Sequence, residues 1–251
     1  MTDNLFSIKD KVVIITGGGQ GIGQFLAFGL LKRGAIVYCI DKKFNKSKNR
    51  DGLHDIPCDI TKIDKIKRAC SEVIRSNKRI DVLINNAGIT MPDNLDNYSL
   101  DSWTKTLDVN LTGTFLFSQQ VLKRMKKNHS GSIINITSIN AEFGFPNNPA
   151  YIASKGGLKM LGKSLARDYG KYGIRVNNLG PGYIITKMTE KSYRNKKKYA
   201  ARKANTMLGR WGKVDDLLGP CIFLASDASS YMTGQDIYVD GGWSANGLQD
   251  E

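Results

Sequence analysis

Short apolar runs alternate along the chain with longer segments of helical periodicity. The run at 12–15 is continuous and β-branched, which is typical of a strand buried on both faces. After it, Ile22, Leu26 and Leu30 recur every four residues, and Gly34 follows as a helix-ending signal. The pattern predicts seven strands, at 12–15, 36–40, 56–58, 82–84, 132–137, 175–179 and 236–239. It predicts a helix beginning near Ile22 and further helices at 63–73, 110–127, 151–172 and 214–224.

The predicted elements follow one another without a Pro- or Ser-rich linker. Because strands that alternate with helices form a parallel sheet covered on both faces, the expected fold class is α/β with a doubly wound seven-stranded sheet. We expect a single domain, 1–251. The stretch 182–212 lacks clear strand or helix periodicity, and we expect a substrate-covering lid at about 183–212.

Cysteine, histidine and apolar content exclude several classes of protein. The four cysteines include no CxxC pair, which indicates reduced thiols, and His54 and His129 lie outside any metal-ligand spacing. We therefore expect no metal site. The longest apolar run, 25–31, is too short to span a bilayer, and no secretory signal is visible. These observations predict a cytoplasmic protein with no membrane partner.

The chain carries 37 Lys+Arg against 23 Asp+Glu, a formal charge of +14. A surplus of this size is compatible with phosphate binding, but the two dense basic runs, 42–48 and 194–203, are not interleaved with aromatic residues as in a nucleic-acid-binding module. We therefore expect a solvated basic surface and no nucleic-acid partner. Attraction of an anionic small-molecule substrate is the main alternative.

A glycine-rich turn, TGGGQGIG at 16–23, lies between the first predicted strand and the first predicted helix. Glycines in this position permit positive φ and bring backbone N–H groups close to a pyrophosphate at a helix N-terminus. The position of the turn therefore predicts a dinucleotide cofactor. The expected contacts are Gly17, Gln20, Gly21, Ile22 and Gly23.

Asp41 ends the second predicted strand, 18 residues after Gly23. A carboxylate there accepts hydrogen bonds from the adenosine ribose and repels a 2′-phosphate, so NAD is favoured over NADP. Lys42 and Lys43 follow directly and could bind that phosphate, whereas Gln20 supplies no cation. NADP therefore remains an alternative.

Tyr151 and Lys155 are four residues apart on one predicted helix and so share a face. An adjacent ammonium stabilises a phenolate and lowers the pKa of a tyrosine, which makes it a usable proton donor and acceptor. The pair follows Ser138, which stands just past a predicted buried strand. The three residues predict a catalytic site.

In sequence order, these motifs resemble the short-chain dehydrogenase/reductase family over essentially the whole chain. The matching segments are TGGGQGIG at 16–23, NNAG at 85–88, DVNLTG around Asn110, ITSIN around Ser138, YIASK at 151–155, PGYIIT at 181–186 and VDGGW near the end. The resemblance implies a Rossmann-type fold and an NAD(P)-dependent alcohol dehydrogenase or ketoreductase. It also implies a homotetramer or dimer, in which the helices containing Asn110 and Tyr151 and the last strand form the contacts.

By the same resemblance, Tyr151 is the general acid, Ser138 binds the substrate oxygen, Lys155 binds the nicotinamide ribose, and Asn110 holds a water of the proton relay. Tyr151, Ser138 and Asn140 would contact substrate. Further cofactor contacts are implied at Asp59, Ile60, Asn86, Gly88, Pro181, Ile184 and Thr186. Purely structural roles stay open for Asn110 (capping or bridging helices), Asp59 (capping the following helix) and Thr186 (a loop hydroxyl).

Segments 181–189 and 208–212, with the C-terminal motif, look most like the gluconate 5-dehydrogenase and 2-dehydro-3-deoxygluconate dehydrogenase branch of the family. Polar residues before Tyr151 would suit a hydrophilic sugar acid, and basic residues at 187–203 would attract its carboxylate; the polar residues are Asn140, Glu142, Asn147 and Asn148. The alternatives are a 3-oxoacyl-acyl-carrier-protein reductase, whose acidic partner would also favour a basic surface, and, more remotely, a non-catalytic NAD-binding protein.

Overall fold

One sheet of parallel strands forms the centre of the computed structural model, which describes residues 4–44 and 51–246. Within these residues the sheet has seven strands in the order β3-β2-β1-β4-β5-β6-β7. The strands are β1 (Val12–Thr16), β2 (Ile36–Asp41), β3 (Leu53–Pro57), β4 (Val82–Asn85), β5 (Gly131–Ile136), β6 (Ile174–Pro181) and β7 (Asp236–Val239). The predicted seven-stranded parallel sheet is confirmed. The strand order reverses between β1 and β4, which places a crevice at the carboxyl ends of these two strands.

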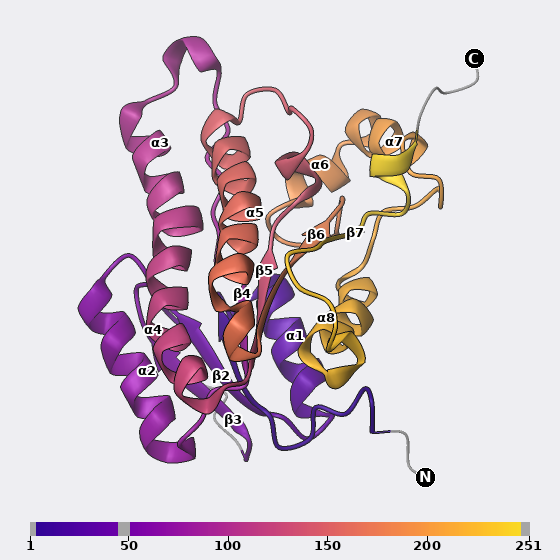
Figure 1. Ribbon diagram of the computed structural model, residues 1–251. Helices are drawn as coiled ribbons and strands as arrows, with labels where there is room; N and C mark the ends of the chain where they lie inside the picture. The colour runs from indigo at the N-terminus through magenta and orange to yellow at the C-terminus, as the bar shows by residue number, and fades with distance from the viewer. Residues whose placement is uncertain (1–3, 45–50, 247–251) are drawn as a thin grey trace.

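Helices cover both faces of the sheet (Figure 1). Helices α1 (Gly21–Leu31) and α8 (Leu218–Ala225) pack on one face, and α2 (Ile63–Asn77), α4 (Gly113–Asn128) and α5 (Pro149–Tyr169) pack on the other. Alternate residues of β1 enter the two cores: Val13 and Ile15 pack with α1 and α8, and Val12 and Ile14 with the other three helices. Burial on both faces explains the continuous apolar run.

Several helix boundaries differ from the prediction. Helix α3 (Leu100–Leu107) continues through a π-helical turn, Asp108–Thr112, into α4, so the helix predicted from 110 begins at Leu100. The predicted helix at 214–224 is a 3₁₀ turn, Val214–Leu217, followed by α8, and α5 ends in a 3₁₀ turn, Gly170–Tyr172. None of the helices in the described part of the chain is long and apolar enough to cross a membrane.

The 183–212 segment contains two helices, α6 (Glu190–Arg194) and α7 (Lys196–Ala204). Its two ends meet beside the sheet, where Ile184 and Gly212 form an isolated parallel bridge. Gly212 N–H donates to the Tyr183 carbonyl and Ile185 N–H donates to the Gly212 carbonyl, each at 2.9 Å. Figure 1 shows α6 and α7 at the end of the molecule where α5 begins.

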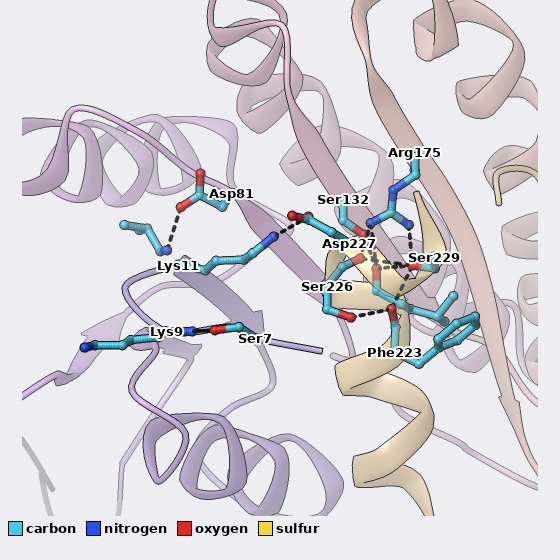
Figure 2. A network of polar contacts seen from close by, with 12 residues as sticks. Ser7, Lys9, Lys11, Asp81, Ser132, Arg175, Phe223, Ser226, Asp227 and Ser229 are labelled. Atoms are coloured by element: carbon cyan, nitrogen blue, oxygen red, sulfur yellow. Dashed lines mark hydrogen bonds and ion pairs between the residues drawn. The ribbon is translucent and has the colours of Figure 1, made fainter. Parts of the chain in front are cut away.

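A polar network ties α8 to the amino ends of β5 and β6 (Figure 2). The Arg175 guanidinium donates to the carbonyls of Leu224 and Ser226 at 3.0 and 3.1 Å and to Ser229 Oγ at 2.7 Å. Ser132 Oγ donates to the Leu224 carbonyl at 2.7 Å. These bonds satisfy carbonyls at the C-terminal end of α8 that have no partner within the helix.

A row of polar side chains crosses the sheet beneath α5. Asn85, Asn135, Asn178 and Asp236 occupy matching positions on β4, β5, β6 and β7. Each asparagine donates to the next residue in the row, at 2.9, 2.9 and 2.7 Å. A one-residue slip would move each side chain to the opposite face and break the row, so these bonds specify the register. Gly162 of α5 makes room, because a Cβ there would lie 2.4 Å from Asn178 Oδ1.

Candidate active site

The predicted site residues gather at the carboxyl ends of the parallel strands. The glycine-rich turn follows β1, Asp41 ends β2, the 86–88 loop follows β4, Ser138 follows β5, and Pro181 ends β6. Ligands of doubly wound sheets bind at this edge, in the crevice where the strand order reverses. The fold therefore brings residues from five separated segments to one side of the molecule.

The turn after β1 has the backbone geometry that glycine allows. Gly17 and Gly21 have φ values of +66° and +57°. A Cβ on Gly23 would lie 2.3 Å from the Gly17 carbonyl oxygen, so a larger residue would push the helix away from the turn. Helix α1 begins at Gly21, and its first N–H groups are free to bind an anion. Gln20, the exposed N-cap residue, makes no side-chain capping bond. The turn fits a pyrophosphate.

Asn86 and Gln24 fasten this turn to its surroundings. The Asn86 side-chain amide donates to the carbonyls of Thr16 and Gly17 at 3.0 and 3.1 Å. Gln24 Nε2 donates to the Gly19 carbonyl at 2.8 Å. Asn86 was expected to line the cofactor, and in the structure its amide binds the turn itself. Gln24 was not predicted; the available signal was a polar residue one helical turn after Gln20.

Asp41 lies directly against the turn. Its carboxylate accepts the N–H of Gly19 at 3.0 Å and that of Lys42 at 2.7 Å. The side chain is partly exposed, so its remaining lone pairs are available to ribose hydroxyls. Lys42 and Lys43 are both exposed, and the Lys42 ammonium pairs with the Asp59 carboxylate at 3.0 Å.

The two residues expected to flank adenine have different environments. Asp59 precedes α2 and accepts hydrogen bonds from the Thr61 N–H and hydroxyl at 2.9 and 2.8 Å. Burial alone would raise the pKa of Asp59, but the Thr61 hydrogen bonds and the Lys42 ammonium hold that pKa below its ordinary value. Ile60 is buried in the core on the α2 side, and a Cβ on Gly113 would lie 2.9 Å from its side chain.

Ser138, Tyr151 and Lys155 come together beside the turn. Ser138 is the N-cap of a 3₁₀ turn, Ile139–Ala141, and Tyr151 and Lys155 lie one turn apart near the start of α5. Ser138 hydrogen-bonds the Tyr151 hydroxyl. Lys155 Nζ lies 5.6 Å from the centre of the Tyr151 ring and donates to the Ile136 carbonyl at 2.7 Å. The Tyr151 hydroxyl, the Ser138 hydroxyl and the Lys155 ammonium therefore lie close together.

Burial controls the pKa values in this group. It lowers the pKa of Lys155 to about 8 and raises the pKa of Tyr151, while the Ser138 hydrogen bond acts on Tyr151 in the opposite direction. The expectation that Lys155 lowers the pKa of Tyr151 below its ordinary value is therefore corrected. The Lys155 ammonium is directed to a backbone carbonyl, and desolvation of the Tyr151 hydroxyl has the larger effect.

Asn110 lies in the π-helical turn between α3 and α4 and is fully buried. Its Oδ1 accepts the Ile89 N–H at 2.8 Å, and its Nδ2 donates to the Ile89 carbonyl at 2.9 Å and to Ser154 Oγ at 3.0 Å. Asn110 thus joins the loop after β4 to α5. Gly88 fits between the polar groups, since a Cβ there would lie 3.4 Å from Asn110 Oδ1 and 3.7 Å from Lys155 Nζ.

The loop from Ser138 to Tyr151 contains the polar residues expected near substrate. The Asn140 N–H donates to Ser138 Oγ at 3.1 Å, and Asn148 Nδ2 donates to Thr90 Oγ1 at 2.8 Å. Glu142 differs from the expectation, because its carboxylate binds Lys159 and the Tyr238 hydroxyl and therefore fixes the loop to α5 and β7.

The last three predicted cofactor contacts lie where the chain leaves β6. Pro181 is buried at the end of that strand, and Ile184 is buried where the 183–212 segment closes on Gly212. The Thr186 N–H donates to Thr189 Oγ1 at 3.0 Å. Thr186 therefore takes part in a local turn at the start of this segment.

The doubly wound sheet, the glycine-rich turn at its crevice and the Ser138–Tyr151–Lys155 group define an oxidoreductase that uses a nicotinamide dinucleotide. A family model described as enoyl-(acyl carrier protein) reductase matches residues 17–244. The chain belongs to the short-chain dehydrogenase/reductase family.

Relatives of known activity cover nearly the whole chain. This chain is 34% identical over 247 residues to gluconate 5-dehydrogenase of Gluconobacter oxydans, and the match covers 95% of this chain and 96% of that protein. It is 34% identical over 248 residues to 5-keto-D-gluconate 5-reductase of Escherichia coli K12, covering 96% and 98%. A crystal structure of a gluconate 5-dehydrogenase from Burkholderia cenocepacia, in complex with NADP and tartrate, has a TM-score of 0.89, 33% identity and coverage of 96% and 98%.

Proposed function

We propose that this protein interconverts a secondary alcohol and a ketone on a sugar acid of the gluconate type, with Tyr151 as the acid and base. The observation that carries the proposal is the group formed by Ser138, Tyr151 and Lys155 beside a turn that fits a pyrophosphate. The gluconate and 5-keto-gluconate activities named for the relatives support the substrate class.

A nicotinamide dinucleotide held at the glycine-rich turn would supply or accept the hydride at the substrate carbon. In the reductive direction, the Tyr151 hydroxyl gives its proton to the carbonyl oxygen, and in the oxidative direction it takes the proton from the alcohol. Ser138 Oγ–H donates a hydrogen bond to the same oxygen and holds it beside Tyr151. Lys155, whose Nζ lies 5.6 Å from the centre of the Tyr151 ring, is assigned to the nicotinamide ribose. Asn110 positions this group by joining α5 to the loop after β4.

For the cofactor, NAD is our proposed preference. The Asp41 carboxylate, held against the turn by Gly19, favours ribose hydroxyls over a 2′-phosphate. Lys42 is a weaker phosphate ligand than its position suggests, because it is already paired with Asp59. The Burkholderia cenocepacia relative binds NADP. NADP therefore stays the alternative for this chain.

The 183–212 segment is proposed as the substrate lid, because its ends meet at Ile184 and Gly212, next to the end of β6.

A homotetramer is proposed as the assembly, with α4 and α5 at the contacts. Phe115 and Met160 on these helices are apolar and 39% and 61% exposed. Light scattering tests the assembly, and a monomer would contradict it.

The activity is tested with a panel of sugar acids, polyols and acyl thioesters, followed by NADH absorbance. We expect turnover of sugar acids by the wild type, and a loss of about 100-fold or more for Tyr151→Phe with unchanged dinucleotide affinity. Activity on acyl thioesters alone would support the 3-oxoacyl-acyl-carrier-protein reductase alternative. Near-full turnover by folded Tyr151→Phe would overturn the mechanism.

A further inference from the structure

Arg202 differs from every other cation of the 183–212 segment. The segment holds nine Lys and Arg residues and a single acidic residue, Glu190. Eight of the nine are solvent-exposed, and only Arg202, on α7, is partly buried. Two of the exposed residues, Arg194 and Arg210, have carboxylate partners in Glu190 and Asp216. The charge of Arg202 is therefore partly shielded from solvent, unlike the other eight.

Three aromatic rings surround the Arg202 guanidinium. Its central carbon lies 4.5 Å from the ring centre of Tyr183, 5.4 Å from that of Phe145 and 5.7 Å from that of Trp211. Rings at these distances attract a cation and restrict the plane of the guanidinium, while its N–H groups remain able to donate. Arg202 is thus held in place before any ligand binds.

Two of these rings come from chain segments that adjoin the catalytic group. Phe145 lies in the loop between Ser138 and Tyr151, and Tyr183 follows Pro181 at the end of β6. Through them α7 contacts the two loops at the carboxyl edge of the sheet. The guanidinium therefore lies between the 183–212 segment, to which it belongs, and the loops at the carboxyl edge of the sheet.

The surroundings of Arg202 lack a matching negative charge. Among residues 4–44 and 51–246, no Asp or Glu forms an ion pair with it, and its polar partner there is the Tyr183 hydroxyl. A guanidinium has five N–H donors in a fork that fits a carboxylate. A partly buried guanidinium with such donors and without a carboxylate partner can bind an anion.

We propose that Arg202 binds the carboxylate of the substrate and so selects sugar acids over neutral sugars and polyols. This inference rests on the proposed function and deepens it. The exposed lysines of the segment attract any anion from a distance. Arg202 instead fixes the carboxylate end at one place, with the reacting carbon left to Ser138 and Tyr151.

The test compares Arg202→Met with Lys203→Met, which removes an equal charge from the adjacent, exposed position. We expect Arg202→Met to raise the KM for D-gluconate about 10- to 100-fold, as for loss of a charge-assisted hydrogen bond, with the KM for the dinucleotide unchanged. Arg202→Lys should recover part of the loss. Lys203→Met should change the KM less than about threefold.

Calorimetric titration with D-gluconate in the presence of NADH, which cannot accept a hydride from it, measures binding without turnover. Wild type and Lys203→Met should bind gluconate, and Arg202→Met should bind it at least about tenfold more weakly. Equal losses in Arg202→Met and Lys203→Met would show a bulk charge effect, and a parallel rise in the dinucleotide KM would show a structural role; either result overturns the inference. If wild type uses gluconate and Arg202→Met keeps its KM, the inference fails while the proposed function stands. A wild type that neither binds nor turns over any sugar acid would refute both.

Discussion

The carboxylate of Asp41 accepts the backbone N–H of Gly19 at 3.0 Å. This contact joins the end of β2 to the glycine-rich turn after β1, and a Cβ on Gly19 would lie 2.8 Å from Asp41 Oδ2. The acidic residue therefore does two separable things: its oxygen positions the turn, and its charge faces the place where an adenosine ribose would lie.

Replacing Asp41 by asparagine separates these two roles. Asp41→Asn keeps an oxygen that can accept the Gly19 N–H and removes the charge. We expect the ratio of kcat/KM with NADH to that with NADPH to fall about tenfold, because the repulsion of a 2′-phosphate is lost. Asp41→Ala should also raise the KM for both dinucleotides, since the turn loses its support. A wild type that prefers NADPH would contradict the assignment.

The low pKa of Lys155 predicts how stability depends on pH. Burial places the pKa at about 8 in the folded protein, against 10.5 for an ordinary lysine. Between these values the unfolded chain binds more protons than the folded one, so stability rises with pH in this window. Relative to Lys155→Met, the wild-type free energy of unfolding should rise by up to about 3 kcal/mol from pH 8 to 10.5. Urea unfolding at a series of pH values measures it, and a difference independent of pH would refute it.

Replacing Arg175 should lower the stability of the fold without changing the catalytic activity. Arg175→Met removes the donors to the Leu224 and Ser226 carbonyls and should lower the free energy of unfolding by about 2 kcal/mol. The KM values should not change, because Arg175 lies at the amino end of β6, away from the site. Lys67→Met, which breaks an exposed ion pair of 3.9 Å, is the control and should cost less than about 0.5 kcal/mol. Equal losses in the two variants would argue against the network.

The sheet could be predicted because burial on both faces makes its strands plainly apolar. Helix α7 could not be predicted in this way, because its sequence, KKKYAARKA, has no apolar stripe. Its Tyr199 instead packs by stacking on Trp211. Its available signals were the helix-forming residues and the N-cap Asn195, whose side chain accepts the Lys198 N–H at 3.0 Å.

At the site, spacing predicted Ser138, Tyr151 and Lys155, because two of them share a helix face and the third comes just after a strand. The roles of Asn86 and Arg202 in the structure were beyond this reasoning. Asn86 binds a turn about seventy positions earlier in the chain, and Arg202 depends on rings from the 145 and 183 loops. Contacts between loops that lie far apart in the chain produce no periodic pattern of residues from which they could be predicted.

The bridge between Ile184 and Gly212 brings the two ends of the segment between them together beside the sheet. Insertions, deletions or exchanges within it would leave the seven strands and the dinucleotide turn unaltered. The segment is thus a natural place for grafting: replacing residues 190–211, which leaves the proposed cofactor contacts Ile184 and Thr186 in place, by the corresponding stretch of a relative should transfer that relative's substrate choice.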